Sequence, residues 1–397
     1  ISNTQVTDLN PVLAMSGLVN VDLNLVPASH EQYQTLESHG LHISGFIAGG
    51  IDFDDLDLPD PYLQECVLNH AQGLTVTGQL THLDCTNTGI TEIYGIEAFH
   101  NLEQVHLAEN GIIDIGPLGA LNRLREVAIH NNPVKDLNAL NGLQNLERMW
   151  IDNIILEDAS QLDNFQHVDV NGTINQGMPL NDLAHLADAE LQRCVADHLN
   201  GQQWGSQLRD LHCDGNDYNI ASLHGIELLV GIENLNLSNV TAGNFEFVAQ
   251  IPALTNLDAW DSSFNQGHFD TFRGHKRIAN LAIGNGPDLG TNLDAASEML
   301  NLNFLHLWGD ESKVFDLSPL FELKKFRNLA MNVNQYQDTQ QLRHLDLHGL
   351  WFNGEHGPAD FSAMLSQVNL GYISLSFNQL DDHGIAEMSQ HLVNLNS

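Results

Sequence analysis

The chain has 397 residues, of which 42% are hydrophobic, and it carries 14 basic against 51 acidic side chains, a formal net charge of −37 at pH 7. That apolar content suffices for a continuous core, while the charge disfavours the phosphates of nucleic acid and anionic membrane surfaces as partners. No apolar run reaches the ~18 residues of a membrane span, so we expect no nucleic-acid binding and no membrane insertion, and cations, basic proteins or neutral ligands as partners.

The first 55 residues contain fragments of a repeated pattern. Asn3-x-x-Val6-x-Asp8 has the form of the back half of a repeat, and Leu18-x-x-Val21-x-Leu23 follows it. The chain begins with Ile1 in place of Met, which favours a processed product or part of a longer protein. We interpret residues 1–55 as the end of an upstream repeat array.

An acidic run lies at the end of this segment. It comprises Asp52, Asp54, Asp55 and Asp57. Oxygen-rich turns of this kind can hold calcium, although the spacing does not match the twelve-residue EF-hand loop. The alternative is a solvated acidic loop on an acidic protein. We expect no cofactor other than a calcium ion, for which these four aspartates are the candidate ligands.

A helix is predicted over residues 60–72. Asp60 can cap its first turn and Pro61 suits the first helical position. The residues expected on its apolar face are Leu63, Cys66, Val67 and His70. The same Leu-Gln-x-Cys-Val sequence recurs from Leu191, which predicts an equivalent helix over 188–200. We interpret both helices as caps of repeat arrays or connectors between them.

Between these helices the sequence repeats with a period of 22 residues. The pattern Leu-x-x-Leu-x-Leu, or a close variant, starts at Leu80, Leu102, Leu124 and Leu146, and an asparagine follows at Asn110 and Asn132. The L-x-L part is typical of a short strand with alternate side chains inward, and one repeat buries its apolar face only by stacking on its neighbours. The sequence therefore predicts an α/β leucine-rich-repeat solenoid with a parallel concave sheet and a helical or irregular convex side.

The pattern resumes, with looser spacing, after the second helix. The predicted starts are Leu208, Ile232, Leu254, Ile278, Leu302, Phe326, Leu342 and Leu370. We expect two domains, each opening with a cap helix, over residues 56–179 and 180–397.

The four cysteines form two equivalent pairs, Cys66/Cys85 and Cys194/Cys213. Each pair would link a predicted cap helix to the first strand of the array that follows it. The duplicated spacing favours a disulfide in each pair, which would indicate an oxidising compartment outside the cytoplasm. Buried free thiols and a zinc site are the alternatives.

The repeats resemble those of the bacterial internalins. The resemblance rests on the repeat period, on Gly95-Ile96-Glu97 before Asn101-Leu102, and on the segment Asp114-Ile115-Gly116-Pro117-Leu118. It covers residues 80–171 and, less closely, 208–260, and the longer spacing before Leu370 is similar to ribonuclease-inhibitor repeats. The resemblance implies a secreted or surface-attached recognition protein that binds its partner on the concave sheet. Because the spacing drifts after residue 230, binding to host cells is not carried over.

Side chains that flank the inner leucines would point out of the concave sheet. They are rich in His, Asp, Asn and aromatic residues and contain almost no Lys. Exposed Trp beside polar neighbours is the composition of a binding hot spot and also suits stacking on sugar rings. The candidate ligand-binding residues are His106, His130, Trp150, Asp152, Asp258, Trp260, His306, Trp308, His344 and Asp346.

No recognised catalytic motif accompanies the 21 histidines. We therefore expect a non-enzymatic recognition module, extracellular or on the cell surface, with a protein or carbohydrate ligand. The alternative is a structural spacer or a self-assembling subunit of a larger extracellular protein.

Overall fold

A computed structural model of the chain describes residues 10–13, 15, 20–22, 36, 39–44, 50–284, 290–308, 314–332, 339–353 and 367–374. The chain divides into two compact units, Ile1–Asn175 and Gln176–Ser397. Within the described residues the strands form a two-stranded, a five-stranded and an eight-stranded sheet, and among the helices described none is long and apolar enough to cross a bilayer. The division into three parts at residues 55 and 179 stays a prediction.

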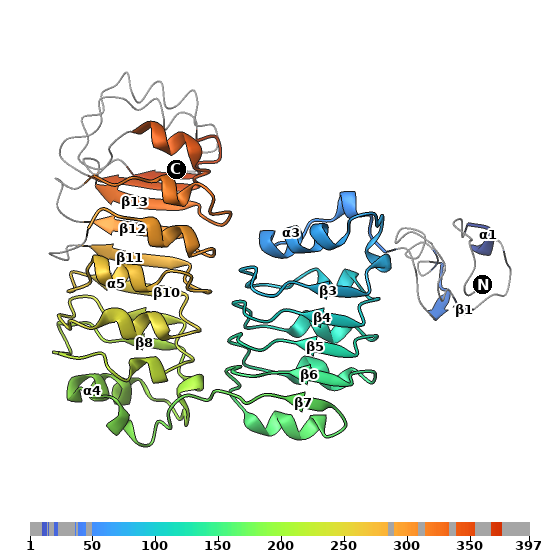
Figure 1. Cartoon of the computed structure of the whole chain (residues 1–397), viewed down its shortest axis with the longest axis horizontal. Helices are drawn as coiled ribbons and strands as arrows, with labels where there is room; N and C mark the ends of the chain where they lie inside the picture. Colours follow the sequence, from blue (N-terminus) through green and yellow to red (C-terminus); the bar gives the residue numbers. More distant parts are fainter. Residues whose placement is uncertain are drawn as a thin grey trace. The chain divides into compact units, whose positions relative to one another are not determined.

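The first unit contains a small parallel pair and a five-stranded parallel sheet (Figure 1). Its helices and strands are α1 (Asn10–Leu13), β1 (Asn20–Asp22), β2 (His42–Ser44), α3 (Pro61–His70), β3 (His82–Asp84), β4 (Gln104–His106), β5 (Glu126–Ala128), β6 (Arg148–Trp150) and β7 (Asp169–Asn171). The short 3-10 helices are η1 (Phe53–Asp55), η2 (Thr77–Gln79), η3 (Ile96–Ala98), η4 (Gly116–Ala120), η5 (Asn138–Gly142) and η6 (Ala159–Phe165).

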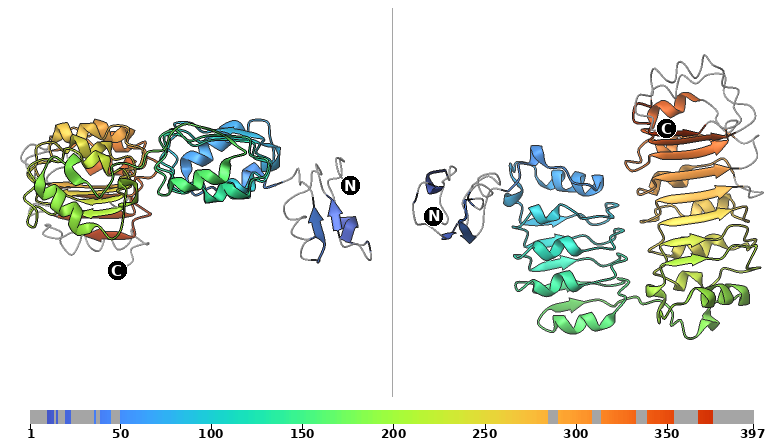
Figure 2. Two further views of the ribbon diagram at one scale, coloured as in Figure 1. Left: turned by 90° about the horizontal axis from the view of Figure 1, so that it is seen from below. Right: turned by 180° about the vertical axis from the view of Figure 1, so that it is seen from behind.

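The second unit is built in the same way around the eight-stranded parallel sheet (Figure 2). Its helices and strands are α4 (Ala189–His198), β8 (Asp210–His212), β9 (Asn234–Asn236), β10 (Asn256–Trp260), α5 (Gln266–Thr271), β11 (Asn280–Gly284), β12 (Phe304–Trp308), β13 (Asn328–Asn332), β14 (Gly349–Asn353) and β15 (Tyr372–Ser374). The 3-10 helices are η7 (Leu183–His185), η8 (Gly205–Gln207), η9 (Ile226–Leu228), η10 (Phe245–Gln250), η11 (Asp294–Glu298), η12 (Ser318–Leu320) and η14 (Thr339–His344).

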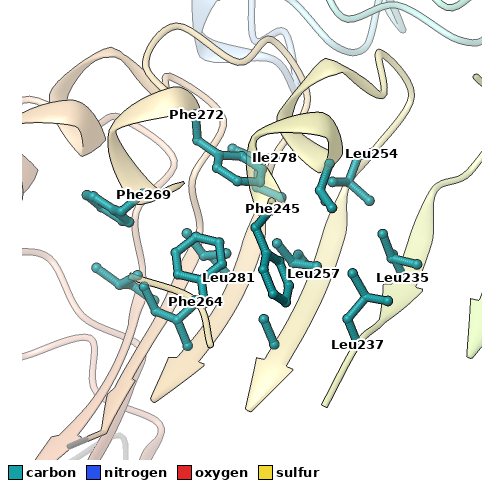
Figure 3. Close-up of a cluster of buried hydrophobic side chains, with 14 of the residues drawn as sticks. Leu235, Leu237, Phe245, Leu254, Leu257, Phe264, Phe269, Phe272, Ile278 and Leu281 are labelled. Carbon is teal, nitrogen blue, oxygen red and sulfur yellow. The ribbon is translucent and has the colours of Figure 1, made fainter. Parts of the chain in front are cut away.

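The core of each array lies between its sheet and its short helices. In the second unit the inward-facing leucines of adjacent strands, Leu235, Leu257 and Leu281, stand in register. Phe245 and Phe269, from η10 and α5, close the same layer from the opposite side (Figure 3). All five are buried, and each contributes on the order of 2 kcal/mol of hydrophobic burial. This is the leucine-rich-repeat fold that the sequence pattern predicts.

The repeat asparagines hold the turns together from inside the core. Asn110, only 1% exposed, accepts hydrogen bonds at Oδ1 from the backbone N–H groups of Gly89 (2.9 Å) and Ile90 (3.1 Å). Its Nδ2 donates to the carbonyls of Cys85 (2.7 Å) and Leu107 (2.9 Å). One side chain therefore forms hydrogen bonds with backbone N–H and C=O groups of its own turn and of the preceding turn. These groups lie outside the hydrogen bonds between strands.

The glycine of the Gly-Ile-Glu motif begins a 3-10 helix in a left-handed conformation. Gly95 has φ 93° and Gly225 has φ 100°, a region that costs little only for glycine. The carboxylate two residues later accepts a hydrogen bond from the glycine N–H: Glu97 accepts from Gly95 at 2.9 Å and Glu227 from Gly225 at 2.8 Å. The motif thus fixes the turn that leads into η3 and η9.

A buried aspartate ties each cap helix to its array. Asp60 is 2% exposed, and its Oδ1 accepts from the N–H groups of Tyr62 and Leu63 at the start of α3. Its Oδ2 accepts from the N–H groups of Thr91 (3.0 Å) and Glu92 (3.2 Å) in the first repeat. Asp188 has the same two roles for α4, so the helix cap and the docking contact depend on one carboxylate.

Replacing Asp60 with asparagine is expected to lower the free energy of unfolding of the first array by about 2–3 kcal/mol. Each oxygen of Asp60 accepts hydrogen bonds from two backbone N–H groups. Asparagine has only one acceptor oxygen, so its NH₂ group would face the other two N–H donors and could not accept from them. Urea unfolding followed by circular dichroism measures the loss. Asp54→Asn is the matched control because Asp54 is exposed; equal unfolding midpoints for the two variants would contradict the dual role.

Both cysteine pairs are disulfides. Cys66 is bonded to Cys85 and Cys194 to Cys213, each with 19 residues of separation and a Cα–Cα distance of 5.8 Å. Cys66 and Cys194 lie on α3 and α4, and their partners directly follow β3 and β8. Each disulfide therefore links a cap helix to the first strand of its array, as predicted.

The prediction of a strand directly after Leu342 is wrong. Thr339–His344 form η14, and β14 begins at Gly349. Two overlapping segments fit the pattern, one starting at Leu342 and one at Leu347. The second follows Phe326 at about the usual repeat spacing, whereas the first comes too early to cross the convex side. Consequently Trp351 takes the position on the sheet that was expected for Asp346, and Gly349 takes that of His344.

Candidate binding faces of the two sheets

In each array the strand side chains that point away from the core form what we call the outer face of the sheet. Strand burial alternates accordingly: in β3, Leu83 is buried between the exposed His82 and Asp84. Because the strands are parallel and in register, residues at equal positions form rows across the sheet. Any ligand-binding surface on the sheets must be built from these rows.

On the outer face of the five-stranded sheet, His106 and Trp150 flank Ala128. The three residues come from β4, β5 and β6 and are paired in register. The His106 and Trp150 rings have centroids 6.3 Å apart with their planes at 77°. Both side chains are half-buried, while Ala128 between them is 6% exposed. The small side chain lets the two rings approach each other and stand up from the sheet.

Acidic side chains surround this pair. Burial raises the pKa of Asp84, but hydrogen bonds from Thr86 and the nearby His106 outweigh it and the net shift is downward. The His106 Nδ1 lies 3.8 Å from Asp84 Oδ2. Hydrogen bonds from the backbone and side chain of Thr173, both 3.0 Å, lower the pKa of the Asp152 carboxyl. The face therefore carries fixed negative charge.

In a second row on this sheet three adjacent side chains pair with one another. Gln104 donates to Glu126 Oε1 at 3.2 Å, and Arg148 forms an ion pair with the same carboxylate. By contrast, His130 lies just beyond β5, and its Nδ1 has no hydrogen-bond partner among the described residues. The predicted residues His106, His130, Trp150 and Asp152 thus lie on neighbouring strands or directly after them.

On the outer face of the eight-stranded sheet, Asp258, Trp260 and His306 gather around β11. The Trp260 and His306 ring centroids are 4.8 Å apart. Asp258 Oδ1 accepts hydrogen bonds from Ser238 Oγ (3.0 Å) and from the backbone N–H of Trp260 (3.1 Å). Burial lowers the pKa of His306, and Asp258 partly offsets this. Strand β11 contributes only Ala282 and Gly284 at these positions.

A groove, which we call the Ala282 groove, lies on this face and is lined by residues of β8 to β12. Its volume is about 280 Å³. The residues that line it with their side chains are His212, Asn234, Asn236, Asn256, Asp258, Asn280, Ala282 and Phe304. Half of these are asparagines, which were not among the predicted binding residues. They gain significance only from the register that brings them together.

Aromatic residues continue from the groove toward β15. Phe304 lies 6.0 Å from His306 and 5.6 Å from Trp351, and Trp351 lies 5.0 Å from Tyr372, measured between ring centroids. Trp351 was missed because the strand after Leu342 was misplaced. The Leu347-x-x-Leu350-x-Phe352 spacing is the signal that could have found it.

The remaining predicted residues do not lie together on the outer face. His344 belongs to η14 and packs on Phe321 at a centroid distance of 4.8 Å. Asp346 precedes β14, and its Oδ1 accepts a hydrogen bond from Asn369 at 2.8 Å. Trp308 ends β12, and its side chain lies outside the described residues.

Calcium at the acidic run Asp52, Asp54, Asp55 and Asp57 stays a prediction. Among the residues that the structure describes, no three His, Cys, Asp or Glu side chains are close enough to hold a metal ion. Asp52 caps η1 by accepting a hydrogen bond from the Asp54 N–H at 3.0 Å.

Repeated parallel strands, buried turn asparagines and short convex-side helices make this chain a leucine-rich-repeat solenoid protein. The solved structures that it resembles include internalins and a further leucine-rich-repeat protein. One is an internalin (inlF) from Listeria monocytogenes, 19% identical over 82% of this chain and 98% of that chain, with a TM-score of 0.36. An internalin C2 from the same organism is 20% identical over 72% and 100% of the two chains, with a TM-score of 0.28.

A leucine-rich-repeat protein from Leptospira interrogans is also similar. It is 13% identical over 83% of this chain and 97% of that chain, with a TM-score of 0.31. No protein-family model matches the sequence, and no curated protein matches it.

Proposed function

We propose that the chain is a non-enzymatic recognition module that binds a protein or carbohydrate ligand on the outer faces of its sheets. The observation that carries this proposal is a constellation present in both arrays. In each array a half-buried tryptophan and a histidine stand close together on the two sides of a strand whose nearest residues are small: Trp150 and His106 flank Ala128 of β5, and Trp260 and His306 are in register with Gly284 and Ala282 of β11.

Such a constellation suits binding for energetic reasons. Trp buries a large area with only two side-chain torsions to fix, and it is enriched at binding hot spots. Here the ring contacts restrain the torsions further, so little conformational entropy is lost when a ligand is bound. The strands beneath are held in register on both sides, which keeps the rings in place.

The proposed location is extracellular or on the cell surface. Two disulfides, Cys66–Cys85 and Cys194–Cys213, favour an oxidising compartment. The net charge of −37 keeps such a surface soluble and directs it toward basic or neutral partners.

The test is alanine substitution at Trp150 and Trp260. The purified chain is applied to an array of glycans and to an array of secreted and cell-surface protein ectodomains, and the affinities of its ligands are measured by surface plasmon resonance. We expect at least one of the two variants to bind its ligand about 30-fold more weakly, the effect of losing a hot-spot residue.

The control is Tyr94→Ala, which removes an exposed aromatic ring that lies outside the strands. Thermal unfolding is recorded for all three variants to exclude misfolding. Unchanged affinity in both tryptophan variants, with a loss in the Tyr94 variant, would place the binding surface elsewhere and overturn the proposal.

A further inference from the structure

The side chains that line the Ala282 groove limit the chemical class of ligand that it can bind. Ala282 is among the residues that line it and lies between Asp258 of β10 and His306 of β12 in the register of the sheet. Phe304 of β12 continues the row of half-buried asparagine side chains, next to Asn280. The groove is therefore lined by a row of amides that ends in an aromatic ring.

The row of asparagines is a ladder of side-chain amides. Asn280 donates a hydrogen bond to Asn256, Asn256 donates to Asn234, and Asn234 donates to Asp210 Oδ1 at 2.6 Å. Strands in register place these amides side by side at the strand spacing of about 4.8 Å. Each ladder contact uses one N–H and one oxygen lone pair per residue, which leaves a second donor and a second lone pair on each amide.

The ladder therefore presents donors and acceptors in alternation, and its amide groups cannot rotate freely. A hydroxyl group is both a donor and an acceptor, so a row of hydroxyls matches this row without leaving an amide unsatisfied. The residues that line the groove include neither Lys nor Arg, and they do include the Asp258 carboxylate. An anionic ligand would be repelled, and one carboxylate is too few to select a strongly cationic one.

From these observations we propose that the Ala282 groove binds a neutral saccharide. The aliphatic face of a pyranose ring packs against Phe304, while its hydroxyls bond to the amides of Asn256 and Asn280 and to the free oxygen of Asp258. This inference rests on the proposed function, since it assigns a ligand class to one of the two outer faces. It does not involve the His106–Trp150 pair of the other array.

The test uses the full chain and three neutral trisaccharides, cellotriose, maltotriose and mannotriose, titrated by isothermal calorimetry. Ala282→Leu fills the groove, and Asn256→Ala interrupts the ladder. Asn328→Ala is the matched control because Asn328 occupies the same row on β13 but does not line the groove. Thermal unfolding of each variant shows whether it is folded.

We expect at least one trisaccharide to bind with a dissociation constant in the millimolar range or below. Ala282→Leu should abolish detectable binding, Asn256→Ala should weaken it about tenfold, and Asn328→Ala should leave it within twofold. If Ala282→Leu unfolds, the comparison of Asn256→Ala with Asn328→Ala is sufficient to show whether the saccharide binds in the groove.

Two results would overturn the inference. The first is a protein ligand on the array whose binding depends on Trp150 or Trp260, with no trisaccharide bound; recognition would then stand and the saccharide assignment would fall. The second is trisaccharide binding that Asn256→Ala and Asn328→Ala reduce equally, which would place the sugar outside the groove. A chain that binds neither proteins nor glycans would instead remove the proposed function itself.

Discussion

Replacing Asn110 with alanine is expected to lower the free energy of unfolding of the first array by about 4 kcal/mol or more. The side chain joins two successive turns through acceptors and donors that are all buried. Alanine cannot bond to any of them, and a buried backbone group without a partner costs about 1–3 kcal/mol. Because at least four groups lose a partner, water entering the turn can recover only part of the loss.

Hydrogen exchange measured by mass spectrometry is the appropriate readout because it reports on each segment separately. Protection should fall in the peptides that contain the turns after β3 and β4. Asn138→Ala serves as the control: Asn138 is exposed and belongs to the same array. Exchange that is as fast in the control as in Asn110→Ala would mean that the buried bonds are not the source of stability.

Removal of one disulfide is expected to destabilise its own unit by about 3 kcal/mol, the loop-closure value for a link of this length. The variant Cys66→Ala/Cys85→Ala tests the first cap, and Cys194→Ala/Cys213→Ala tests the second. Alanine is preferred to serine because all four cysteines are buried and a hydroxyl there would add an unsatisfied polar group.

Each double variant acts as the control for the other. Hydrogen exchange should accelerate in α3 and β3 for the first variant and in α4 and β8 for the second, with little change in the other unit. A chain whose unfolding midpoint in urea is the same with and without either disulfide would contradict a stabilising role for these links.

Most of the strands could be predicted from the sequence because one spacing governs them. Leu83, Val105, Val127 and Met149 stack on one another in register, as the period requires. The Asp60 cap was also predictable, because Asp followed by Pro is a strong local signal for a helix start. Local signals of this kind do not depend on distant parts of the chain.

The candidate site was harder to predict because its parts have no local signal. Asn280 and Ala282 are ordinary strand residues until the register places Asn280 between Asn256 and Phe304. The same register places Ala282 between Asp258 and His306. At Leu342 two overlapping patterns competed, and the local match favoured the wrong one. Only the spacing from the preceding repeat separates them, since the chain must be long enough to cross the convex side before the next strand begins.

The bonds of Asn132 have a consequence for how the array can change in length. Asn132 Nδ2 donates to the carbonyl of Leu107, at 2.8 Å, and its Oδ1 accepts from the N–H of Ile112. These are the backbone positions that Cys85 and Ile90 offer to Asn110 one repeat earlier. A genetic deletion or duplication of one whole repeat would bring each asparagine to an equivalent pair of partners. Unequal recombination can therefore lengthen or shorten the array by whole repeats, whereas a shift by a fraction of a repeat would break every turn beyond it.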